Sequence, residues 1–428
     1  MSTFTSAEVN HMRLHVLPSQ QFKTYSLALY IGLPLNEETV TPTALLPFVW
    51  RRGNSCYPET IKFREKLDEL YGAGFGFDIV KRGNDQILII RMDIANDAFV
   101  KGEHHSLLYE ALGFLSDTVY RPLIENGAFR EQYVTSEKET LRKRIEAVIN
   151  DKIRYAAERL IAVMCRNESY RLPALGRVDD LPNIDSQALY DHYESLLERS
   201  CVDLFIVGDT TLSEAQSFVS ELFPQKGTRP AHYEPAVLTR SHIQEREVVE
   251  QLDVKQGKLN MGLRTYVGYG DEAYPAALVY NGILGGYPHS KLFINVREKE
   301  SLAYYASSRL DGHKGIITVQ TGIEIANKEK AESIIRKQID DMKQGNISDD
   351  ELSKTKTMIA GSLKEMDDSA FDQIAFHFNS VLSGNPRSKD DLIDAVMQID
   401  KSSVIELAQQ VDLDTIYFLR DQEGGKHP

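Results

Sequence analysis

The chain has 428 residues, a length that suits two or three domains or one large repeat, and its 42% hydrophobic and 26% charged residues are typical of a soluble globular protein. Its net charge of −14 disfavours a nucleic-acid partner, because phosphate binding needs basic patches. No apolar run approaches the roughly 18 residues of a membrane span, and residues 1–17 do not resemble a signal peptide. We therefore expect a cytoplasmic protein with no membrane span.

The first half of the chain alternates between strand and helix patterns. Apolar runs and period-two alternation predict strands over residues 12–17, 22–33, 86–94 and 202–207. Helical spacing of apolar residues predicts helices over residues 41–50, 61–71, 105–119, 129–160 and 187–197. Three prolines and a glycine then follow within residues 224–235, and this composition predicts a linker over residues 224–240.

After the linker the same kind of pattern begins again. Strands are predicted over residues 247–254, 259–266, 307–323 and 415–419. Helices are predicted over residues 273–284, 328–344, 348–364 and 402–411. The third of these helices begins with the spacing of a capping box, formed by Ser348 and Glu351.

The two halves are related by an internal repeat with a constant offset of 233 residues. The matching segments are Ala44-Leu45 with Ala277-Leu278, Arg64-Glu65-Lys66 with Arg297-Glu298-Lys299, and Tyr71 with Tyr304. Register kept through a helix, a turn and a second helix indicates duplication. We therefore predict two homologous α+β halves, residues 1–223 and 241–428, joined by the linker.

Arg297 and Tyr304 are the first candidate functional pair. If one helix runs through both, seven steps of 100° leave the two side chains about 20° apart on one face. A guanidinium and a phenolic hydroxyl on one face could hold a carbonyl oxygen or a developing oxyanion. Arg and Tyr also share helix faces for packing reasons alone, so the spacing leaves both interpretations open.

The motifs around this pair resemble a known family. Leu284-Gly285-Gly286, then Ser-x-Leu-Phe at residues 290–293, then Val-Arg-Glu-Lys-x-x-Leu-Ala-Tyr ending at Tyr304, resemble the C-terminal signature of the pitrilysin/insulinase zinc metallopeptidases, which include the mitochondrial processing peptidase. The resemblance implies that Arg297 and Tyr304 bind the substrate backbone and that Gly285 and Gly286 line the substrate chamber. It also implies two halves that form a clam shell, each a mainly antiparallel sheet with helices packed on one face.

The resemblance fails at the metal site. Active members carry His-x-x-Glu-His, and the matching residues 44–48, here called the degenerate motif, have Ala44 and Phe48 in place of the histidines and Pro47 in place of the catalytic glutamate. Glu137 falls near the third ligand, but one carboxylate cannot hold zinc, and a solvated helix residue is the simpler interpretation of it. We therefore predict no metal and no cofactor.

These observations predict an inactive, YmfF-like member of the family. Our first hypothesis is a non-catalytic subunit of a heterodimeric zinc metallopeptidase, which supplies Arg297 and Tyr304 to an active sibling that carries the zinc motif. The alternative is a proteolytically inactive peptide-binding or scaffold protein. The expected partners are that sibling or a second copy of the chain, and a peptide or small-protein substrate. Arg64 and Tyr71 repeat the spacing of the pair in the first half, and we interpret them as a product of duplication without a function of their own.

Overall fold

The computed structural model describes residues 3–100, 106–226, 233, 234, 236, 238 and 243–422. The predicted linker lies largely outside these residues. The chain folds into two compact units, and each takes segments from both halves of the sequence. The first unit consists of Met1–Glu146, Leu172–Tyr233 and Ser369–Phe378, and the second of Ala147–Arg171, Glu234–Asp368 and Asn379–Pro428.

The first unit is built on a six-stranded sheet with the order β1-β2-β8-β3-β5-β4. The strands are β1 (Thr5–Val9), β2 (Met12–Pro18), β3 (Thr24–Pro34), β4 (Gly74–Arg82), β5 (Asp85–Ala95) and β8 (Cys201–Gly208). Only β2 and β8 run parallel; the other neighbours are antiparallel. Alternate residues along β3, such as Leu27, Leu29 and Ile31, enter the main core of this unit.

Helices supply the other side of that core. They are α1 (Val40–Trp50), α2 (Thr60–Glu69), α3 (Leu107–Tyr120), α4 (Glu131–Glu146), α6 (Ser186–Arg199) and α7 (Leu212–Leu222). The prediction of one continuous helix over residues 129–160 is wrong, because the segment forms two helices, α4 and α5 (Lys152–Met164). A 3-10 turn (Ala147–Asn150) follows the end of α4, and the Asp151 side chain caps the start of α5 by accepting a hydrogen bond from the backbone N–H of Arg154.

The second unit has a five-stranded sheet with the order β11-β12-β10-β13-β9. Its strands are β9 (Arg246–Gln251), β10 (Gly257–Arg264), β11 (Ala303–Asp311), β12 (Ile316–Ile323) and β13 (Asp412–Arg420). Its helices include α8 (Tyr274–Asn281), α9 (Lys328–Lys343), α10 (Asp349–Glu365), α12 (Lys389–Gln398) and α13 (Lys401–Gln410). The capping box predicted at Ser348 and Glu351 is confirmed at the start of α10.

The two sheets share one topology. Read from the opposite edge, the second sheet has the order β9-β13-β10-β12-β11, which matches β2-β8-β3-β5-β4 strand by strand. The single parallel pair, β9 with β13, matches the parallel pair β2 with β8. Two α+β units with mainly antiparallel sheets, as the sequence repeat predicts, are therefore confirmed, and β1 is an addition to the first.

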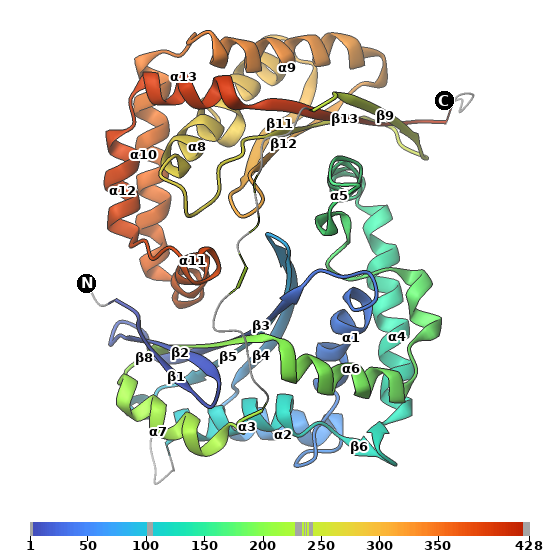
Figure 1. Cartoon of the computed structure of the whole chain (residues 1–428), viewed down its shortest axis with the longest axis vertical. Helices are drawn as coiled ribbons and strands as arrows, with labels where there is room; N and C mark the ends of the chain where they lie inside the picture. The colour runs from blue at the N-terminus through green and yellow to red at the C-terminus, as the bar shows by residue number, and fades with distance from the viewer. Residues whose placement is uncertain are drawn as a thin grey trace. The chain divides into compact units, whose positions relative to one another are not determined.

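Each sheet also carries one helix on the face opposite its main core. On the first sheet, His377 and Phe378 of α11 (Ala370–Ser383) contact the rings of Phe205 and Tyr30. On the second, α5 (Lys152–Met164) packs against β10 and β13 (Figure 1). The helix comes in each case from the other half of the sequence, so the expected arrangement of helices on one face is accompanied by an exchanged helix on the other.

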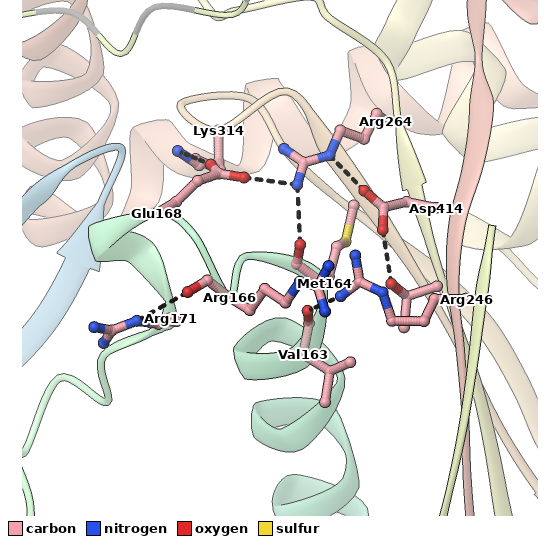
Figure 2. A network of polar contacts seen from close by, with 10 residues as sticks. Val163, Met164, Arg166, Glu168, Arg171, Arg246, Arg264, Lys314 and Asp414 are labelled. Carbon is pink, nitrogen blue, oxygen red and sulfur yellow. Dashed lines mark hydrogen bonds and ion pairs between the residues drawn. The ribbon is translucent and has the colours of Figure 1, made fainter. Parts of the chain in front are cut away.

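A polar network fixes the end of α5 to the second sheet (Figure 2). Arg264 of β10 donates to Asp414 at 2.8 Å, to Glu168 at 2.7 Å and to the Met164 carbonyl at 3.2 Å. Lys314 forms a second ion pair with Glu168 at 2.6 Å. Burial raises the pKa of the Glu168 carboxyl, but Lys314 and Arg264 outweigh it and hold that pKa below its usual value. The carboxylate is therefore charged and pairs with both cations.

Candidate functional site

The degenerate motif lies in the apolar interior of the first unit. Ala44 is 0% exposed and Phe48 is 2% exposed, and Pro47 is buried within α1. The ring of Phe48 packs edge-on against Phe77 of β4, with 4.9 Å between the ring centres. In place of a ligand cage, these side chains form ordinary hydrophobic packing between α1 and the sheet.

Glu137 lies beside the end of α1 and is an ion-pair partner. Its side chain is only 2% exposed, and it accepts from Arg51 at 3.3 Å and from Arg52 at 3.2 Å. The interpretation of Glu137 as a solvated helix residue is therefore wrong. Sequence reasoning missed Arg51 and Arg52, although two consecutive arginines directly after a motif that has lost its histidines were a visible signal.

The residues present do not fit a zinc ion. Zinc in proteins takes three or four nitrogen, sulfur or oxygen ligands. The positions that match those ligands carry a methyl group and a phenyl ring, and the one retained carboxylate, Glu137, is held by two guanidinium groups. In the part of the chain that the structure describes, no group of three His, Cys, Asp or Glu residues could hold a metal ion.

Arg297 and Tyr304 do not lie on one helix. Arg297 is in the π-helical segment η6 (Phe293–Lys299), which ends before Ser301, a residue with a positive φ of 51°. Tyr304 follows in β11, where the register against β12 shifts between Ala303 and Tyr305. The expectation that the two side chains stand 20° apart on a common helix is therefore wrong, because the helical segment ends at Lys299 and Tyr304 lies in a strand.

Both side chains are nevertheless presented to solvent. Tyr304 is 58% exposed at an edge strand of its sheet, and Arg297 is exposed with its guanidinium 4.6 Å from the ring centre of Phe293. Among the described residues, neither the guanidinium of Arg297 nor the hydroxyl of Tyr304 has a hydrogen-bond or ion-pair partner. The segment η6 and the strand β11 therefore present a guanidinium and a phenolic hydroxyl whose hydrogen-bond donors have no acceptor among the described residues.

The two glycines differ in their surroundings. Gly285, in η5 (Gly282–Gly286), is buried, and a Cβ there would lie 2.5 Å from the backbone nitrogen of Ser308 in β11. Close packing between η5 and β11 therefore accounts for a glycine at this position. Gly286 is exposed, and its Cβ would meet Asn281 at 3.3 Å. A role for either glycine in substrate binding stays a prediction.

Comparison with known proteins identifies the family. Residues 183–359 match the model of the Peptidase M16 inactive domain. The chain is 39% identical over 414 residues to the probable inactive metalloprotease YmfF of Bacillus subtilis strain 168, covering 96% of each protein. This chain belongs to the M16 peptidase family. The resemblance expected from the sequence motifs is thereby confirmed.

Solved structures agree with the M16 assignment. A conserved protein from Enterococcus faecalis V583 is 33% identical with a TM-score of 0.89, and the match covers 99% of this chain and 100% of that one. A protease from Helicobacter pylori has the same fold at 14% identity, with a TM-score of 0.79 and coverage of 98% and 100%. With its inactive-domain match and its inactive relative, the chain is a non-catalytic M16 metalloprotease homologue. No helix in the described ranges is long and apolar enough to cross a membrane.

Proposed function

We propose that this protein is the non-catalytic subunit of a heterodimeric, cytoplasmic zinc metallopeptidase. A sibling subunit with an intact His-x-x-Glu-His motif would hold the metal. This chain would contribute Arg297, which binds a carbonyl oxygen of the substrate, and Tyr304, which donates to the oxyanion that forms during cleavage. Gly285 and Gly286 would line the same site, and residues 1–223 and 241–428 would be the two homologous halves.

One observation carries the proposal. The guanidinium of Arg297 and the hydroxyl of Tyr304 are exposed and lack partners among the described residues, while the degenerate motif has become part of a core. A large aromatic side chain that is 58% exposed on an edge strand stabilises its own fold little. The elements that carry Tyr304 and Arg297, β11 and η6, are in contact, and a ligand would explain why both side chains are exposed without a hydrogen-bond partner in the described residues.

The test is a cleavage assay with purified subunits. The chain is co-expressed with the sibling, a mixed dimer is isolated by gel filtration, and peptide cleavage is compared with that of the sibling alone. Tyr304→Phe in the mixed dimer should lower kcat about 10²–10³-fold, the usual cost of losing one oxyanion donor. Tyr71→Phe is the matched control, because Tyr71 occupies the equivalent place in the repeat and is 52% exposed.

Two results would contradict the proposal. An unchanged rate for Tyr304→Phe would remove the catalytic role of that hydroxyl. A sibling that cleaves equally well without this chain would leave only a binding or scaffold role.

A further inference from the structure

Three guanidinium groups gather where an active relative would bind its metal. The guanidinium carbons of Arg51 and Arg144 lie 5.4 and 5.6 Å from the centre of the Phe48 ring. The sum of these distances, 11.0 Å, is the largest separation the two groups can have. Arg52 joins them through Glu137, which it shares with Arg51. We call Arg51, Arg52 and Arg144 the arginine cluster.

The cluster has more positive charge than its surroundings neutralise. Glu137 is the only carboxylate that forms an ion pair with any of the three arginines within the described residues, so two formal positive charges remain. Arg144 is exposed and makes no ion pair with any described residue. The Nε of Arg52 is buried and has no acceptor in the described structure. A buried donor without an acceptor costs free energy until a ligand supplies one.

Packing alone does not account for this arrangement. Stacking of a guanidinium on a phenyl ring is worth about 0.5–1 kcal/mol at an exposed site. Like charges that share one ring repel each other, and the repulsion is relieved when an anion binds between or beside them. Arginine also presents a planar fork of donors that matches a carboxylate, with charge-assisted hydrogen bonds about twice as strong as neutral ones.

We infer that the arginine cluster is a subsite for a carboxylate of a bound peptide. The loss of the histidines has reversed the preference of the site: where relatives bind a cation, this chain binds an anion. The carboxylate can belong to an acidic side chain or to the C-terminus of the peptide, and both have the same chemistry. The inference rests on the peptide-binding role proposed above and names the class of peptide.

Calorimetric titration of the full chain at low ionic strength tests the subsite. Three versions of one short peptide are used: several glutamates with an amidated C-terminus, glutamines in their place with the same amide, and the glutamine version with a free C-terminal carboxylate. The glutamate version should bind about tenfold more tightly than the amidated glutamine version, and added salt should remove the difference. Tight binding of the third version instead would assign the site to a C-terminal carboxylate.

Variants connect the preference to the cluster. Arg144→Gln should abolish the preference for a carboxylate, because Arg144 has no other ion-pair partner in the described residues. Lys143→Gln is the matched control, since Lys143 is the preceding residue of the same helix, has a side chain that is 74% exposed, and lies 3.7 Å from its ion-pair partner Glu139. Thermal unfolding of both variants shows whether each is folded.

The outcomes separate this inference from the proposed function. Equal binding of the glutamate and amidated glutamine peptides together with no gain for the free C-terminus, or a preference that survives Arg144→Gln, would overturn the subsite. That result would leave the effect of Tyr304→Phe on cleavage intact. A carboxylate preference that depends on Arg144, in a chain that adds nothing to cleavage by the sibling, would keep the subsite and reject the catalytic partnership.

Discussion

Met164 occupies the space that a side chain at Gly262 would need. A Cβ built on Gly262 would lie 2.5 Å from the sulfur of Met164, so α5 approaches β10 as closely as it does only because position 262 has no side chain. Close by, Ala156 and Leu160 of α5 pack with Tyr417 and Leu419 of β13. The exchanged helix is therefore part of the core of the second unit.

Gly262→Val should destabilise the protein. The added side chain has to displace Met164, and overpacking of this kind typically costs about 1–3 kcal/mol. Gly76→Val is the control, because Gly76 also lies in a strand and a Cβ there meets nothing within 4 Å. Urea unfolding followed by circular dichroism should show a lower midpoint for Gly262→Val alone. Equal midpoints would mean that α5 does not need the close approach.

The ion pair between α1 and α4 gives a second prediction. Glu137→Ala would leave Arg51 and Arg52 without a carboxylate partner next to the core, and breaking a buried pair typically costs about 3–5 kcal/mol. Because both arginines are partly exposed, we expect a loss near the lower end, about 3 kcal/mol. Glu139→Ala, on an exposed position of the same helix, should change the unfolding free energy by less than about 0.5 kcal/mol. Similar losses of unfolding free energy in the two variants would show that Glu137 stabilises the protein no more than an exposed glutamate of the same helix does.

Local patterns predicted the elements well. The periods of apolar residues located most helices and strands to within a few residues, and the offset of 233 residues predicted two sheets of one topology. The elements depend on near neighbours in the chain, and the repeat appears when two segments of the sequence are compared, so a sequence shows both directly.

Contacts between distant segments were not predictable in the same way. The exchange of α5 and α11 depends on tertiary packing, and an amphipathic helix does not indicate which sheet it will cover. The burial of Glu137 follows from pairing with the end of α1, 85 residues away. The helix expected to join Arg297 to Tyr304 ends because Ser301 takes a positive φ, which residue type alone does not predict.

The pH dependence of stability should reflect His377, a histidine of α11 whose ring contacts Phe205 on the first sheet. Burial is the main cause that lowers the pKa of His377 to about 4; neighbouring His15 acts in the same direction and Asp203 in the opposite one. The unfolded chain has the ordinary value near 6.5 and therefore binds more protons between pH 6.5 and 4, so the folded state loses stability as the pH falls through that range. His377→Gln should make the unfolding free energy less dependent on pH between 7 and 5. An unchanged slope would place the effect on other groups, such as His192, whose pKa burial also lowers to about 4.

Restoring the family motif should not by itself restore metal binding. The variant consists of three substitutions, Ala44→His, Pro47→Glu and Phe48→His. Its third ligand, Glu137, would still be held by Arg51 and Arg52, whose positive charges also repel a dication. Gel-filtered protein should therefore contain well below one zinc per chain by elemental analysis. Adding Arg51→Leu and Arg52→Leu frees the carboxylate, and the zinc content should rise towards one. A full equivalent of zinc with both arginines in place would contradict this prediction. It would show that the three substitutions suffice for metal binding and that the ion pairs of Glu137 with Arg51 and Arg52 do not prevent it.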